Sequence, residues 1–218
     1  MVPSNHRQAL RGRTSSTQGV PVRPMCPDLT SQSSAPEGFF MGDITIPGYL
    51  TQAKLEEAVR ALLPNGFIGR ELRVGSSMKR WDMVVRTPSG ECAIEFDGYS
   101  HYTSPRVVIS DEIKGEYAKS SGMNLVRIPY FVQLTTETLN YFLGISASVI
   151  QDFPHGFIDP KAKLPSEFCE LGVARFSQEL SCLPRTVSVA ITRSLKAKCA
   201  TSDPRLVVPP SLRSLIED

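Results

Sequence analysis

The stretch Arg80–His101, RWDMVVRTPSGECAIEFDGYSH, decides the fold that this sequence predicts. Two apolar-rich segments, Arg80–Arg86 and Glu91–Asp97, have the Val, Ile, Phe and Trp content typical of strands. Between them Thr87-Pro88-Ser89-Gly90 supplies the Pro and Gly that favour a chain reversal. We therefore predict a β-hairpin.

The hairpin carries carboxylates in register. Side chains alternate between the two faces of a strand, so Asp82 is expected on one face with Val84, opposite Trp81, Met83 and Val85. The second strand repeats this arrangement, with one face predicted to hold Glu91, Ala93, Glu95 and Asp97. If the other face is buried, three carboxylates can converge: Asp82, Glu95 and Asp97.

Such a cluster predicts a metal site, because neighbouring carboxylates raise one another's pKa and are costly without a cation. Oxygen ligands favour Mg²⁺ or Mn²⁺, and these ions support phosphodiester hydrolysis. The alternative is that the carboxylates form the solvated face of an amphipathic hairpin. The pattern alone leaves both readings open.

The order of motifs along the chain adds a resemblance. The residues that carry it are Asp82, Glu95-Phe96-Asp97-Gly98, His101, Asp111, Lys114, Gly122 and the strand Asn124–Ile128. In these motifs the chain resembles the PD-(D/E)xK nuclease superfamily. More narrowly, it resembles the branch that holds very-short-patch repair endonucleases, small restriction-like nucleases and the RAP domain. The resemblance covers the segment from Leu50 to Leu134.

The resemblance implies a restriction-endonuclease-like α/β core, with a central mixed β-sheet flanked by helices. It also implies a metal-dependent endonuclease that uses Mg²⁺ or Mn²⁺, with DNA expected more than RNA. Asp82, Glu95 and Asp97 would be the metal ligands. The chain departs from the family at Asp97, where the superfamily usually has a Lys that orients or activates the attacking water.

Other residues could replace that Lys. Lys114 follows on a predicted helix and is a candidate, although an ordinary exposed helix lysine is the alternative that the sequence favours. His101 could act as a general base or help to position the phosphate, and could instead cap the strand end. Lys79 is a third candidate to replace the lysine, and it is equally placed to contact a phosphate backbone, which is the role that we favour. Arg80 and Arg73 are also expected to contact the phosphates of the substrate. In related nucleases a glutamate of the first helix approaches the metal. Of Glu56 and Glu57 in the first predicted helix, Glu56 is the better candidate for this position because it flanks the buried stripe.

Length and composition limit the fold classes and cellular locations that are compatible with this sequence. A chain of 218 residues with 41% hydrophobic content can build one sizeable core. It has no apolar run that predicts a membrane span, and its first residues do not resemble a secretory signal. Five widely spaced cysteines indicate a reducing, intracellular compartment, cytoplasmic or nucleoid-associated. The net charge of +2 neither predicts nor excludes nucleic-acid binding.

Three segments are expected along the chain. Residues 1–37 read as a disordered basic arm rich in Ser, Thr and Pro, residues 38–145 as the nuclease core, and residues 146–218 as a helical extension packed on it. In the core, Thr51 should cap a helix through Leu63. A strand is predicted at Phe67–Val74.

A second core helix is predicted between Ser104 and Ser121, with Ile109, Ile113 and Tyr117 in the core. Two other functions stay open beside the nuclease: a nucleic-acid-binding module without cleavage, and a structural or assembly protein with a relic fold. A homodimer is compatible with the nuclease.

Overall fold

The computed structural model describes residues 43–87, 90–151, 167–201 and 208–217. It is an α/β structure whose main sheet has the strand order β2-β3-β4-β5. The predicted disordered arm, 1–37, lies outside the described residues. Within them, no helix is both long enough and apolar enough to cross a membrane.

The central hairpin forms as predicted. Strands β3 (Arg80–Thr87) and β4 (Gly90–Asp97) pair in antiparallel register from Met83 opposite Ile94 to Thr87 opposite Gly90. Strand β2 (Phe67–Arg73) pairs antiparallel with β3, and β5 (Asn124–Pro129) pairs parallel with β4. The sheet is therefore mixed, as the α/β prediction requires.

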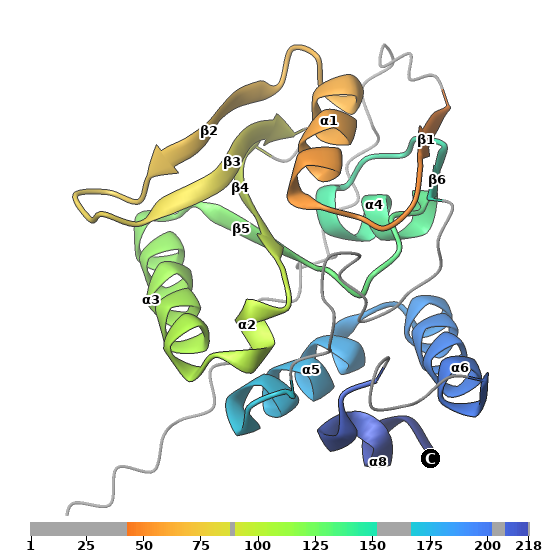
Figure 1. Cartoon of the computed structure of the whole chain (residues 1–218). Helices are drawn as coiled ribbons and strands as arrows, with labels where there is room; N and C mark the ends of the chain where they lie inside the picture. The colour runs from red at the N-terminus through yellow and green to blue at the C-terminus, as the bar shows by residue number, and fades with distance from the viewer. Residues whose placement is uncertain (1–42, 88–89, 152–166, 202–207, 218) are drawn as a thin grey trace, which may run out of the picture.

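Helices cover both faces of this sheet (Figure 1). On one face, helix α1 (Gln52–Leu62) and helix α4 (Thr136–Leu143) pack their apolar side chains on those of β3, β4 and β5. On the other face lies α3 (Pro105–Ser121), which connects β4 to β5 after the short α2 (Ser100–Thr103). Beneath α3, the buried cluster comprises Val74, Trp81, Val84, Ala93 and Ala118.

The ends of these helices follow local sequence signals. The side chain of Thr51 accepts a hydrogen bond from the Lys54 backbone N–H at 3.3 Å, so the predicted cap of α1 is confirmed. Helix α3 ends at Gly122, whose φ of 68° is the left-handed conformation that glycine tolerates best. Both boundaries could be predicted because they depend on adjacent residues.

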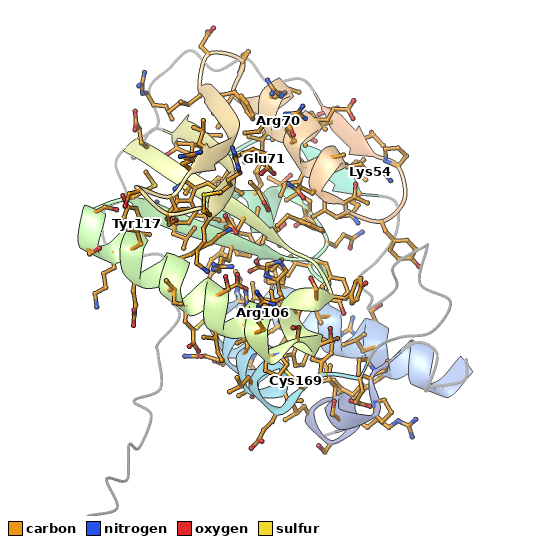
Figure 2. All side chains as sticks on the ribbon, turned by 60° about the vertical axis from the view of Figure 1, so that its left-hand side comes forward. Lys54, Arg70, Glu71, Arg106, Tyr117 and Cys169 are labelled. Carbon is orange, nitrogen blue, oxygen red and sulfur yellow. The ribbon has the colours of Figure 1, made fainter. Side chains whose placement is uncertain are left out.

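The orientation of α3 differs from the prediction. Ile109 and Ile113 are half exposed, at 49% and 50%, and Tyr117 is 38% exposed, so these residues do not belong to the core. Val108, Asp111 and Ala118 are the buried positions of this helix. The four-residue spacing marked the wrong stripe, because α3 turns its polar residues Asp111 and Lys114 toward the sheet. Figure 2 shows Tyr117 on α3, beside the β2–β3 region.

The C-terminal part is helical, as predicted. Helix α5 (Glu170–Cys182) and helix α6 (Arg185–Thr201) are followed by the short η1 (Pro210–Leu212) and α8 (Arg213–Glu217). These helices share a second apolar cluster, which also includes Tyr102 of α2 and Phe131. Figure 1 shows them gathered on the side of the sheet where α2 lies.

A small parallel sheet joins the two ends of the core. Strand β1 (Ile44–Ile46) pairs with β6 (Val149–Gln151), from Ile44 opposite Val149 to Ile46 opposite Gln151. Residues 149–151 therefore pair with the segment before α1. The division of the chain at residue 145 stays a prediction.

Candidate metal centre

One group of polar side chains forms where β3, β4 and α3 meet. We call Asp82, Glu95 and Lys114 the Glu95 group. Lys114 Nζ donates a hydrogen bond to Glu95 Oε2 at 2.6 Å. The backbone N–H of Asp82 donates to Glu95 Oε1 at 3.3 Å, and the backbone N–H of Phe96 donates to Asp82 Oδ2 at 2.8 Å. Three elements thus bring two carboxylates and a lysine together.

The local strand geometry explains the position of Asp82. Regular pairing between β3 and β4 ends at Met83, and at the next step the Asp82 carboxylate, rather than a backbone carbonyl, accepts the N–H of Phe96. Trp81, predicted on the face of Met83, instead packs with Val84 and Ala93. Strict alternation fails at this end of β3, beyond the last residue that pairs with β4, although Trp81 is still paired with Leu72 of β2. The Trp81 ring then lies beneath Lys114, whose Nζ is 5.7 Å from the ring centroid.

Both carboxylates of the Glu95 group are buried enough to resist ionisation. Burial raises the pKa of Asp82 above its ordinary value. Burial also raises the pKa of Glu95 to about 7; the Lys114 charge opposes that shift, and the neighbouring Asp82 adds to it. A divalent cation between the two carboxylates would favour their charged forms.

A second group lies farther along β4. Asp97, His101 and Asp111 each offer a ligand atom, these atoms lie within 4.8 Å of one another, and the group could hold a metal ion. We call it the His101 group. His101 Nδ1 is 2.6 Å from Asp111 Oδ2 and 3.2 Å from Asp97 Oδ1. Both carboxylates are buried.

Two arginines contact the carboxylates of the His101 group. Arg127 of β5 places Nη1 2.8 Å from Asp97 Oδ1 and 3.5 Å from Asp111 Oδ1. Arg175 of α5 donates Nη1 to Asp111 Oδ2 at 2.7 Å and Nη2 to Asp97 Oδ2. Each of the four carboxylate oxygens therefore faces a cationic side chain.

These contacts outweigh the cost of burial for Asp111. Burial alone would raise its pKa, but the hydrogen bond with His101 and the charge of Arg127 hold that pKa well below its usual range. For His101, burial alone would lower the pKa, while the Asp111 hydrogen bond and the Asp97 charge raise it above the ordinary value. The His101 group is thus a buried network of ion pairs.

The predicted site residues divide between the two groups. Asp82, Glu95 and Lys114 come together in one, where Lys114 contacts Glu95. The role of Lys114 in place of the usual lysine stays a prediction. Asp97 and His101 belong to the other. The face of β4 is as predicted, because Cys92 and Ile94 pack in the cluster opposite α3 while Ala93 packs beneath it. The role of Asp97 as a third ligand stays a prediction.

The three predicted phosphate-binding residues lie near the β2–β3 turn. Lys79 Nζ donates to the side chain and the carbonyl of Ser110 in α3, one helical turn before Lys114. Arg80 Nη1 donates to the carbonyl of Glu71 at 2.7 Å. Arg73 is exposed on β2 and has no partner among the described residues. All three remain candidates for substrate contacts.

Glu56 lies away from both groups. Its carboxylate pairs with Arg60 at 2.9 Å and lies 3.9 Å from Arg70. Helix α1 packs on the face of the sheet opposite α3, so the Glu56 side chain does not join Asp82 and Glu95. Figure 2 shows Arg70 next to Glu71 on β2, with Lys54 of α1 to their right.

Sequence reasoning missed Arg127 and Arg175. A signal existed for Arg127, because a charged residue inside the apolar strand Asn124–Pro129 needs a buried partner. No comparable signal existed for Arg175, which lies 78 residues after Asp97 in the chain and meets it only through the fold.

Comparisons of this chain with models of known protein families, with curated proteins and with solved structures found no match.

Proposed function

We propose that this protein is a metal-dependent phosphodiesterase that hydrolyses nucleic acid, with Asp82 and Glu95 holding the cation. Lys114 takes the role of the lysine that the superfamily carries two residues after its acidic ligand. DNA is the expected substrate, and Mg²⁺ or Mn²⁺ the expected ion.

The observation that carries the proposal is the Lys114–Glu95 contact of 2.6 Å beside Asp82. The lysine comes from α3, yet it reaches the same carboxylate that the usual lysine would neighbour on β4. A helix lysine of no function would normally extend into solvent, whereas the Lys114 side chain is only 13% exposed.

The residues present fit a divalent cation. Asp82 Oδ1 has no hydrogen-bond partner among the described residues, and burial favours the neutral form of both carboxylates. When bound, such a cation would polarise a phosphate and lower the pKa of water. Lys114 holds the Glu95 carboxylate in one orientation. Its ammonium also supplies a positive charge that favours an approaching phosphate oxygen.

A polyanionic substrate is consistent with three basic residues near the β2–β3 turn: Lys79, Arg80 and Arg73. Two of them are tied down by hydrogen bonds to Ser110 and Glu71, which keeps their charges near the β2–β3 turn. Because Ser110 precedes Lys114 by one turn of α3, the Lys79 ammonium is held on the helical turn before Lys114. Phosphate contacts at these positions would place a backbone across the carboxylates.

The test is a cleavage assay on supercoiled plasmid, single-stranded DNA and RNA, in Mg²⁺, Mn²⁺ or EDTA. Wild-type protein should cut at least one substrate only with metal, and Glu95→Gln should abolish cutting while remaining folded. Glu91→Gln is the matched control, since Glu91 lies on the same strand but is exposed. Cutting that persists in Glu95→Gln would contradict the proposal.

A second candidate is a nucleic-acid-binding module without cleavage. The position at which the superfamily has its lysine holds Asp97, and that carboxylate is neutralised by Arg127 and Arg175. A chain that binds DNA or RNA with the same affinity in metal and in EDTA, and cuts neither, would establish this reading. A chain that binds neither nucleic acid nor metal would favour a structural role.

A further inference from the structure

Helix α5 docks on the core through the backbone of α2. The N–H of Cys169 donates to the Tyr102 carbonyl at 3.0 Å, and a Cβ added at Gly172 would lie 1.8 Å from the same oxygen. The Tyr102 hydroxyl donates to Glu179 Oε2 at 2.6 Å. Figure 1 shows α5 close to α2, and Figure 2 shows Cys169 below Arg106 of α3. This docking places one face of α5 against the His101 group.

Arg175 is the residue through which α5 enters that group. Its Nε donates to Glu179 Oε1 at 2.7 Å within the helix, while Nη1 and Nη2 bond Asp111 and Asp97 of the core. Its guanidinium carbon lies 5.0 Å above the centroid of the Tyr102 ring. All three nitrogens of a side chain that is only 13% exposed are thus engaged.

A cation at the His101 group would need the same oxygens. Divalent ions bind carboxylate oxygens directly, yet Arg175 engages Asp97 Oδ2 and Asp111 Oδ2, and Arg127 faces the other two oxygens. Two guanidinium charges at such distances repel a divalent cation strongly in a buried setting. The group can therefore accept an ion only after an arginine has left.

Arg175 is the arginine that can leave. Arg127 belongs to β5, the edge strand of the main sheet, which pairs along its length with β4. Arg175 belongs to α5, whose apolar side chains pack in the C-terminal cluster together with Tyr102 and Phe131 of the core. Its withdrawal requires α5 to leave these contacts and undock from α2 and α3, and it leaves the backbone pairing of the main sheet intact.

We propose that Arg175 closes the His101 group to cations, so that docking of the C-terminal helices and cation binding at Asp97, His101 and Asp111 exclude each other. This inference does not rest on the proposed nuclease activity, which uses the Glu95 group. Arg175 of α5 would then compete with a cation for the carboxylates of the His101 group.

The test uses the full chain with the Glu95 group removed by Asp82→Asn and Glu95→Gln. Mn²⁺ is the probe, and calorimetric titration measures its binding. With Arg175 present, this background should bind no Mn²⁺ at the His101 group. Adding Arg175→Met should create or tighten Mn²⁺ binding by about tenfold or more, because an opposing buried charge is gone. A further Asp111→Asn change should abolish that binding.

Arg185→Met in the same background is the matched control, because Arg185 begins α6 and is exposed. It should leave Mn²⁺ binding unchanged. Binding in the background with Arg175 present, lost in Asp111→Asn, overturns the proposal if hydrogen exchange shows α5 still protected when Mn²⁺ is bound. A folded Arg175→Met protein that binds no Mn²⁺ also overturns it.

If the Arg175→Met chain does not fold, the hydrogen-exchange measurement on the background decides. Protection of α5 that falls when Mn²⁺ binds, or no Mn²⁺ binding at all, supports the exclusion. A wild-type chain that binds no Mn²⁺ at all would instead contradict the proposed function. Failure of this inference and failure of the proposed function are therefore distinguishable.

Discussion

At the scale of single residues, Lys114 is the side chain whose position most constrains the chemistry. Its ammonium is 2.6 Å from Glu95 Oε2 and above the ring of Trp81. We expect Lys114→Met to reduce nucleic-acid cleavage by about 10²-fold or more, the usual contribution of a positioned group that stabilises developing negative charge. Cleavage rates at saturating metal measure this change.

Lys119→Met is the control for that variant, because Lys119 lies on the same helix and is exposed. It should cleave at the wild-type rate. Stability should fall in Lys114→Met by up to about 3 kcal/mol, since a buried carboxylate loses its partner. A folded Lys114→Met protein that cleaves at the wild-type rate would show that Lys114 has no role in cleavage.

The raised pKa of Glu95 predicts that the free energy of unfolding depends on pH, which can be measured without an activity assay. Its pKa is about 7 in the folded chain and near 4.5 when unfolded, so between these values the folded state binds the extra proton. Stability contributed by protonated Glu95 is present below the unfolded pKa and is lost as the pH rises through the folded pKa. The difference amounts to about 3 kcal/mol across that window.

The measurement is the free energy of unfolding in urea with EDTA, for wild type and Glu95→Gln, from about pH 5 to about pH 8. Relative to the variant, wild type should lose stability as the pH rises. Because every other titrating group is common to both chains, the difference isolates Glu95. Parallel pH profiles would mean that Glu95 ionises normally.

At the scale of secondary-structure elements, α3 shows how far sequence reasoning reached. The hairpin and the C-terminal end of α3 at Gly122 could be predicted because they depend on nearby turn and cap residues. The face of α3 could not be predicted from periodicity, since its buried side includes Asp111 and Lys114, whose burial depends on partners in other elements. For the same reason the pairing of Asp97 with Arg175 was out of reach.

Because one stripe of α3 is exposed, a substitution there should reduce the free energy of unfolding less than a substitution in the buried core. Ile113→Ala removes a side chain that is half exposed and should cost about 0.5 kcal/mol or less. Ile128→Ala removes a fully buried side chain from β5 and should cost about 2–5 kcal/mol. Chemical denaturation of both variants measures the difference. Equal costs would indicate that α3 packs with its other face inward.

Helix α5 makes a second prediction at this scale. A Cβ at position 172 would lie 1.8 Å from the Tyr102 carbonyl oxygen, so Gly172→Ala should prevent close docking and cost about 3 kcal/mol or more. Gly115→Ala is the matched control, because nothing lies within 4 Å of its added Cβ. That change should be neutral or stabilising, by up to about 1 kcal/mol. Thermal unfolding of both variants tests the contrast.

At the scale of the whole molecule, two clusters of charge sit side by side on one strand. The Glu95 group depends on the sheet and α3 alone, whereas the His101 group is completed by α5. The first has a free carboxylate oxygen and raised pKa values, and the second has arginines on every carboxylate oxygen. We therefore propose that the cation needed for activity binds at the Glu95 group rather than at the His101 group, which could also hold a metal ion.

Mn²⁺ binding by calorimetric titration, in wild type, Glu95→Gln and Asp111→Asn, tests this assignment most directly. We expect one Mn²⁺ to bind wild type, binding to disappear in Glu95→Gln, and binding to survive in Asp111→Asn, with Glu91→Gln as the unaffected control. Binding that survives in Glu95→Gln and disappears in Asp111→Asn would place the cation at the His101 group and contradict the account.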